Sequence, residues 1–236
     1  MSVLEPSYAL KIADRAQLLE QAQTAFDQVW RVDFSAPGFC VIDTGSEIDS
    51  RTVRAWMVEL KERLCEIGTQ RGTGSFGYLS MGRFDQQVTT KFHRDGAPEK
   101  SLLMLGYEPS NVRSRLLLAD FTRAAFDLGM TPQQFLQDYN PMYKNGEEML
   151  GHYITEVPQP SEGISRIVLV NNSLLEFDTE HPNPLGVLHK AIIDNPDESQ
   201  CRIINSTMLA AGEPDRVSIA EQHEFVAAEK ISPKVY

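Results

Sequence analysis

The sequence predicts a mainly β protein, an antiparallel barrel flanked by α-helices. Short apolar segments with β-branched residues recur between about residues 37 and 210, and turn-forming residues bound them. Their long connections do not alternate regularly with helices, which favours antiparallel pairing over a doubly wound parallel sheet. We expect a single domain over residues 1–236, with N-terminal helices and a first strand in 1–70, the core with a helical insert in 83–210, and a surface segment in 213–236.

The N-terminal part is expected to contain two helices with one strand between them. Residues 13–30 carry apolar side chains near helical spacing, and the apolar run 37–43 between turn-forming residues is typical of a strand. The second helix would begin after Asp49 or Ser50 as its N-cap and end near Gly68, which sits where a C-cap glycine belongs.

A glycine-rich segment follows, GTQRGTGSFGYLSMG at residues 68–82. Its five glycines predict a loop too flexible for regular structure, which would be either a mobile cover over a site or an ordinary connection. Gly72, Gly74 and Gly77 match a dinucleotide-binding fingerprint only superficially, because no clear strand precedes them and no helix follows.

Residues 83–95 alternate polar and apolar side chains and are expected to form the next strand. One of its faces would be entirely polar and would include Gln87, Lys91 and His93. His93 and Asp95 would leave the end of this strand two residues apart, so they could bind one metal ion from adjacent coordination positions. We therefore expect this strand to line a cavity that holds a metal.

The remaining elements are mostly short apolar strands. A helical pattern covers 122–139, where Thr131 and Pro132 would start a second helix as N-cap and first residue. Residues 140–163 are rich in turn formers and receive no assignment. Strands are expected at 101–107, 115–120, 164–171, 187–193 and 202–209.

Composition and charge narrow the classes of protein to consider. The formal net charge of −11 argues against a general binder of nucleic acid or of anionic membranes. No apolar run approaches the roughly 20 residues that span a bilayer, and the N-terminus lacks a secretion signal, so we expect a cytoplasmic protein. Three widely spaced cysteines, Cys40, Cys65 and Cys201, fit a reducing compartment better than disulfides or a zinc site. No heptad pattern indicates the oligomeric state.

Two further residues, much later in the sequence, could form one site together with the His-x-Asp pair. His189, in GVLHKAII, lies on an expected strand, and Arg202 lies at the start of the next one. Two histidines and one carboxylate on one face of a metal, with the other positions open, suit non-haem iron(II). An arginine nearby can bind a carboxylate through two parallel hydrogen bonds.

The pattern His93-x-Asp95 … His189 … Arg202 resembles that of the iron(II)- and 2-oxoglutarate-dependent oxygenases. The segment RLLLADFTRAAFDL is similar to the taurine dioxygenase and clavaminate synthase branch, and the resemblance covers roughly residues 37–210. It implies a double-stranded β-helix (jelly-roll) core, iron(II) bound by the three ligands, and Arg202 paired with the distal carboxylate of 2-oxoglutarate. It further implies a dioxygenase that consumes dioxygen and acts on a small or medium-sized organic substrate.

The sequence departs from the family pattern in one respect and keeps it in another. Some members carry a serine two residues after the arginine, whereas Ile204 stands there, and Ser206 is roughly 13 Å from Arg202 along a strand. The residue that assists Arg202 is thus not identified. Halogenating relatives replace the acid by a small residue, so the presence of Asp95 favours hydroxylation or desaturation.

Two further residues are assigned to cosubstrate binding. Gln87 and Lys91 would point into the barrel together with His93, and Lys91 is placed to meet an anionic group of cosubstrate or substrate. The alternative is that Lys91 lies at the barrel rim in solvent.

Other interpretations of the same residues stay open. His181, in a turn-rich loop, is the main rival to His189 as third ligand; His189 is favoured because it lies on an expected strand. The chain could instead be a jelly-roll binding protein without turnover, or a cupin-like metalloenzyme that does not use 2-oxoglutarate.

Overall fold

The computed structural model describes residues 7–231. Every helix in this part of the chain is too short or too polar to cross a lipid bilayer. The elements are, in order, β1 (Ala9–Ile12), α1 (Arg15–Val29), β2 (Phe39–Thr44), α2 (Ser50–Gln70), β3 (Phe76–Asp85), β4 (Ser101–Tyr107), β5 (Ser114–Ala119), α3 (Phe121–Asp127), α4 (Pro132–Asp138), α5 (Lys144–Met149), the 3₁₀ helix η1 (Gly151–Tyr153), β6 (Ile154–Val157), β7 (Arg166–Asn171), β8 (Leu188–Ile193), β9 (Ile203–Ala211) and α6 (Ile219–Ala227).

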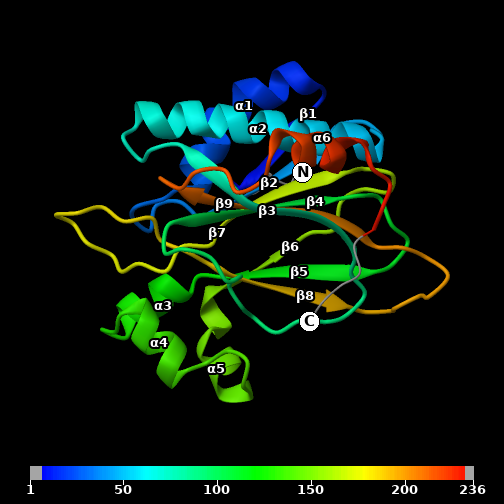
Figure 1. Ribbon diagram of the computed structural model, residues 1–236. Coiled ribbons are helices and arrows are strands. Elements are labelled where there is room, and N and C mark those ends of the chain that lie inside the picture. The colour runs from blue at the N-terminus through cyan, green and yellow to red at the C-terminus, as the bar shows by residue number, and fades with distance from the viewer. Residues whose placement is uncertain (1–6, 232–236) are drawn as a thin grey trace, which may run out of the picture.

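Two sheets with flanking helices make up a mixed α/β fold. The larger sheet has the strand order β1-β2-β7-β4-β9-β3, and the smaller has the order β6-β5-β8. All neighbours pair antiparallel except β1 and β2, which are parallel. In Figure 1, helices α1, α2 and α6 cover one face of the larger sheet, the smaller sheet lies across its other face, and α3, α4 and α5 gather at one end of the smaller sheet. The flanking helices and the antiparallel strands agree with the sequence-based expectation.

Strand β7 shows how the core is divided into layers. Its Ile167 and Leu169 pack with the helices α1 and α2, whereas Val168 and Val170 pack into the apolar layer between the two sheets. A strand buried on both faces needs apolar residues at every position, which explains the continuous run of this segment. A third apolar cluster lies between the smaller sheet and helices α3 and α4.

The glycine-rich segment is ordered, contrary to expectation. Helix α2 continues through Gly68 to Gln70, and β3 already begins at Phe76. A Cβ atom on Gly68 would lie 2.7 Å from the carbonyl oxygen of Gly74, and one on Gly77 would collide with the backbone of Glu213. These glycines therefore allow close backbone approach between packed segments, instead of providing flexibility.

The strand expected at 83–95 is wrong beyond Asp85. Its partner β9 begins at Ile203, opposite Asp85, so the ladder of the larger sheet ends there. The chain then crosses to the smaller sheet, where Thr90 N–H donates to the carbonyl of Ala191 and His93 forms an isolated bridge with His189. The alternation of polar and apolar residues beyond Asp85 therefore does not mark a strand face that points into the space between the sheets.

Most other expected elements are confirmed within one to three residues at each end. Strand β4 has the bounds that the sequence predicts, and Thr131 forms a capping box at the start of α4. Strand β1, strand β6 and helix α5 were not predicted; the last two lie in the segment 140–163 that received no assignment.

Candidate metal centre

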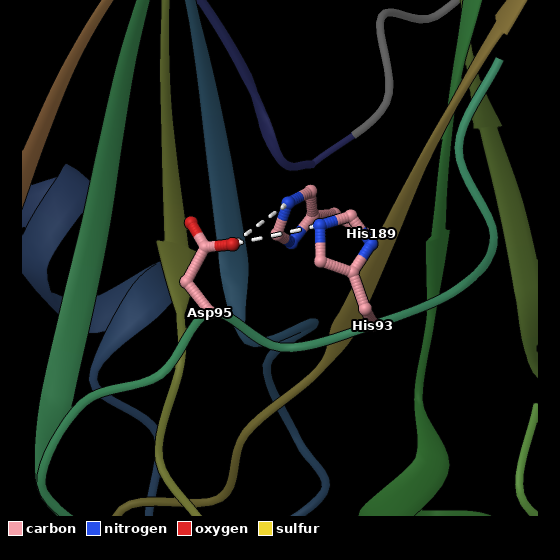
Figure 2. Close-up of side chains that lie close together, drawn as sticks. All are labelled: His93, Asp95 and His189. Carbon is pink, nitrogen blue, oxygen red and sulfur yellow. Dashed lines mark ion pairs between the residues drawn. The ribbon is translucent and has the colours of Figure 1, made fainter. Parts of the chain in front are cut away.

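Three side chains from two distant parts of the sequence converge at one edge of the smaller sheet. His93 and Asp95 belong to the segment that crosses between the sheets, and His189 lies on β8. One ligand atom from each residue can be chosen so that all three lie within 4.8 Å of one another. Figure 2 shows the Asp95 carboxylate pointing toward both imidazole rings.

Backbone hydrogen bonds fix the three residues relative to one another. His93 and His189 exchange N–H···O bonds of 3.1 and 3.0 Å. Beyond the end of β7, the buried side chain of Asn172 accepts from the Asp95 N–H at 2.9 Å and donates to the Asp95 carbonyl at 3.1 Å. Asn172 was not singled out from the sequence, since its role depends on the meeting of two segments about 77 residues apart.

The two imidazoles present their Nε2 atoms to the carboxylate. His93 Nδ1 lies 2.7 Å from the Lys91 carbonyl, which can only accept, so Nδ1 carries the proton and Nε2 is left with its lone pair. The Nε2 atoms of His93 and His189 lie 3.5 and 4.0 Å from Asp95 Oδ1, and the ring centroids are 4.2 Å apart. A backbone carbonyl that orients the far nitrogen is the usual support of a metal-binding histidine.

Electrostatics keep His189 and Asp95 in the protonation states that bind metals. Burial, reinforced by the charge of His93, lowers the pKa of His189 to about 4 against the opposing effect of Asp95, so its imidazole is neutral at pH 7. Burial raises the pKa of Asp95, but the neighbouring side chains of His93, His189 and Arg94 together bring it below its usual value. Neutral imidazoles and an ionised carboxylate are the forms that coordinate a metal ion.

The site is open on one side and closed on the other. The side chains of His93 and Asp95 are 33% and 39% exposed, whereas that of His189 is 11% exposed. His189 Nδ1 is buried and makes no hydrogen bond with any residue of the described chain. A set of two nitrogens and one oxygen that face a common point fits a metal ion, because their mutual distances exceed those of good hydrogen bonds.

Arg202 lies between the sheets at the start of β9. It is 4% exposed, its Nε donates to Ser114 Oγ at 2.8 Å, and its Nη1 donates to the carbonyl and side-chain oxygens of Gln86 at 3.1 and 2.6 Å. The guanidinium carbon lies 5.3 Å from the ring centre of Tyr107. Within residues 7–231 the guanidinium makes no ion pair with a carboxylate. Burial lowers its pKa, whereas the charge and hydrogen bond of Tyr107 and the charge of Asp85 raise it.

Gln87 and Lys91 do not join Arg202. Gln87 Nε2 donates to the Gln200 carbonyl and its Oε1 accepts from the Asp197 N–H, both at 2.8 Å, so the side chain holds the loop before β9. Lys91 is exposed, and its carbonyl orients His93. Their assignment to cosubstrate binding stays a prediction. His181 is 83% exposed, lies beside Asp178, and is not part of the cluster.

Comparisons with known proteins give likenesses of structure only. No family model matches the chain, and no curated protein matches it in sequence. Similar solved structures include asparagine oxygenase (TM-score 0.44, 11% identity, 87% of this chain and 93% of that chain) and AAD-2 in complex with Mn(II) and N-oxalylglycine (0.42, 10%, 89% and 96%). A further structure of asparagine oxygenase, with Fe(II), 2S,3S-3-hydroxyasparagine and succinate, matches at a TM-score of 0.42 and 11% identity over 86% and 93% of the two chains. Likenesses at these scores are no guide to function, which depends on the side chains.

Proposed function

We propose that this chain is a cytoplasmic, single-domain oxygenase with a jelly-roll core that uses iron(II) and 2-oxoglutarate to hydroxylate a small or medium-sized organic substrate. The observation that carries the proposal is the convergence of His93, Asp95 and His189 within 4.8 Å. Two imidazoles and one carboxylate on one face, with the opposite positions open, are the ligand set of non-haem iron(II) oxygenases.

Each of the three residues has a separate part in holding the metal. Asp95 supplies the negative charge, and Asn172 fixes its backbone on both sides. His189 supplies a neutral nitrogen from the closed side of the site, and His93 supplies one from the exposed side. The exposed side leaves room for substrate and dioxygen.

Arg202 is the residue that would bind the distal carboxylate of 2-oxoglutarate. A buried guanidinium without a carboxylate partner is costly unless an anion completes it. Ser114, which holds Arg202, lies four residues along β5 from Leu118, the partner of His189. That separation is roughly 13 Å, comparable to an extended five-carbon acid with a metal bond at one end and hydrogen bonds at the other.

When bound, iron(II) and the 2-oxo acid supply the oxidising chemistry, in which 2-oxoglutarate is converted to succinate and carbon dioxide. The chain supplies binding, orientation and a dry interior. Leu116, Leu118 and Met208 belong to the apolar layer between the sheets, and in this proposal that layer keeps water away from the bound 2-oxo acid.

The test is iron-dependent conversion of 2-oxoglutarate to succinate by the purified protein. Conversion should occur even without the organic substrate, and His93→Ala should abolish it. His181→Ala is the matched control and should leave it unchanged, because His181 lies outside the cluster.

Three results would contradict the proposal. Protein loaded with iron(II) that neither binds 2-oxoglutarate nor converts it is not such an oxygenase. Turnover of a substrate without any 2-oxo acid would indicate a cupin-like metalloenzyme. Tight capture of a small molecule without product would indicate a binding protein.

A further inference from the structure

A cavity of about 440 Å³ opens between the two sheets at the end that lies away from the metal-binding triad. Its inner wall includes Tyr107, Leu116 and Arg202. Tyr107 is the last residue of β4, whereas the first residue, Ser101, contacts Asn172 beside Asp95. The strand separates the cavity from the triad end by roughly 20 Å.

The cavity gives direct access to the one buried cation there that has no carboxylate partner among the described residues. Arg166 also lines it, but its guanidinium is already paired with a carboxylate, since Asp43 accepts from Nε and Nη2 and Pro158 accepts from Nη1. Glu108, at the rim, is neutralised by Arg83 at 3.0 Å. Glu47 and Glu162 also line the cavity and their charges oppose an anion there, so the attraction for an anion must come from Arg202.

The two ends of the space between the sheets thus offer two different routes from solvent toward the triad. At the triad end, the exposed sides of His93 and Asp95 face solvent. At the other end, the cavity extends from solvent past Arg202 to Leu116, which is two residues along β5 from the partner of His189. An anion that entered from this end would meet the guanidinium before it met the apolar layer.

We infer that this cavity is the entrance for the 2-oxo acid, and that the organic substrate approaches the metal from the opposite, exposed face. The inference rests on the proposed function. The 2-oxo end passes Arg202 first and moves toward the triad, and Arg202 then holds the distal carboxylate in place. The cosubstrate and its product succinate can therefore exchange while the organic substrate occupies the other side.

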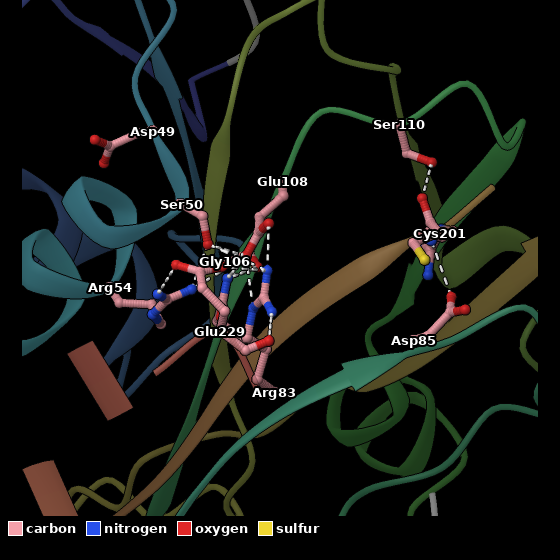
Figure 3. Close-up of polar contacts among 12 residues, drawn as sticks. Asp49, Ser50, Arg54, Arg83, Asp85, Gly106, Glu108, Ser110, Cys201 and Glu229 are labelled. Carbon is pink, nitrogen blue, oxygen red and sulfur yellow. Dashed lines mark hydrogen bonds and ion pairs between the residues drawn. The ribbon is translucent and has the colours of Figure 1, made fainter. Parts of the chain in front are cut away.

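Cys201 provides a chemical handle at the mouth of this cavity. It is exposed, lines the cavity, and accepts a hydrogen bond from Ser110 Oγ to its carbonyl at 2.8 Å, as Figure 3 shows. The other two cysteines are buried, and burial raises the pKa of Cys40 to about 12, so its reactive thiolate is scarce. Methanethiosulfonate reagents should therefore label Cys201 selectively.

The experiment compares a methyl adduct with a bulky aromatic adduct at Cys201 on anaerobic, iron(II)-loaded protein. Association and dissociation of 2-oxoglutarate are followed by stopped-flow absorbance of the metal centre. The bulky adduct should slow both rates at least tenfold while Kd changes less than threefold, because blocking an entrance leaves the bound state intact. Dithiothreitol should restore both rates, and the methyl adduct should have little effect.

Two control proteins test whether the slower 2-oxoglutarate rates come from the adduct at the mouth of the cavity. In Cys201→Ser the reagents should change nothing. In a Cys201→Ser, His181→Cys double variant, the bulky adduct sits on the loop that follows β7, away from the cavity, and should leave the 2-oxoglutarate rates unchanged.

Unchanged association with the bulky adduct at Cys201 would overturn the inference, as would weaker binding caused only by faster dissociation. If the unmodified protein binds no 2-oxoglutarate, the proposed function itself fails, which is a different result.

Discussion

Two clusters of charged residues differ in how their polar atoms are used. In the Glu108 cluster (Ser50, Arg54, Arg83, Glu108 and Asn205), the groups bond to one another. Glu108 Oε1 accepts from Ser50 at 2.6 Å, from Asn205 at 3.0 Å and from Arg83 at 3.1 Å, and Oε2 accepts from Arg83 at 3.0 Å. Figure 3 shows Ser50 and Arg83 beside the Glu108 carboxylate.

The triad of His93, Asp95 and His189 is arranged in the opposite way. The Nε2 atoms of its two histidines lie 3.5 and 4.0 Å from Asp95 Oδ1, which is too far for good hydrogen bonds. Buried polar groups that satisfy one another stabilise a fold, whereas groups held close without bonding well leave capacity for a ligand. The comparison therefore assigns a structural role to the first cluster and a binding role to the second.

The largest expected effect is the loss of metal binding and turnover in Asp95→Ala. Removal of the only carboxylate of the triad should reduce the affinity for iron(II) by at least ~100-fold and bring succinate formation to background. The free energy of unfolding of the metal-free protein should change by less than about 1 kcal/mol, because the side chain is part-exposed and weakly bonded. Calorimetric metal titration and urea unfolding would measure the two quantities, and retained affinity would refute the ligand assignment.

Glu108→Gln should have the reverse profile. It leaves Arg54 and Arg83 with only the exposed carboxylate of Glu229 in place of the buried one, which should cost about 3 kcal/mol of unfolding free energy. Metal affinity should stay unchanged. Glu148→Gln, which removes a surface pair with Lys144 at 3.8 Å, is the matched control and should cost less than about 0.5 kcal/mol. A loss of metal affinity in Glu108→Gln would show that the two clusters are coupled.

The two arginines that line the cavity, Arg202 and Arg166, can be compared in the same way, one as an anion-binding residue and the other as a structural residue. Arg202→Met should weaken 2-oxoglutarate binding by about 2 kcal/mol, or roughly 30-fold, while metal binding is retained. Arg166→Met should instead lower stability, since Asp43 would lose its partner. Calorimetric titration with 2-oxoglutarate, alongside urea unfolding of both variants, tests the pair. Full 2-oxoglutarate affinity in Arg202→Met would eliminate Arg202 as the anion-binding residue.

Local sequence patterns predict the strands that are buried on both faces. They do not predict a segment whose structure depends on contacts with a distant part of the chain. Strand β4 is an uninterrupted apolar run, so its bounds were readable from SLLMLGY alone. The segment 86–95 alternates as a strand would, but β9 offers it no partner beyond Ile203. The glycines of 68–82 predict flexibility, because the sequence does not show which backbones will pack against Gly68 and Gly77; these are distant in sequence or follow a turn.

The candidate site divides in the same way. Histidine, aspartate and arginine in a known order suggested the triad and Arg202, and the structure brings the triad together. The supporting contacts could not be predicted, because Asn172, Ser114 and Gln86 are ordinary polar residues until the sheets form. The Glu108 cluster likewise joins helix α2 to strands β3 and β9 and to the residue that follows β4, and no sequence motif marks it.

The smallest predicted effect is a dependence on pH that isolates the Glu108 cluster. Burial raises the pKa of Glu108, but hydrogen bonds from Arg83, Ser50 and Asn205 outweigh it and bring the pKa below the usual value of a glutamate. A depressed pKa in the folded state means that the contribution of Glu108 to stability is fully present above the unfolded pKa and is lost as the pH falls through the folded pKa.

The difference in unfolding free energy between the wild-type protein and Glu108→Gln should therefore be constant from about pH 7 to about pH 5.5. It should shrink below about pH 4.5, by at most about 1.4 kcal/mol per pH unit for one proton. Urea unfolding of both proteins across this range measures it, and the subtraction cancels the other carboxylates. A difference that stays constant at acid pH would mean that the pKa of Glu108 is the same in the folded and unfolded states, so that its charge does not stabilise the fold.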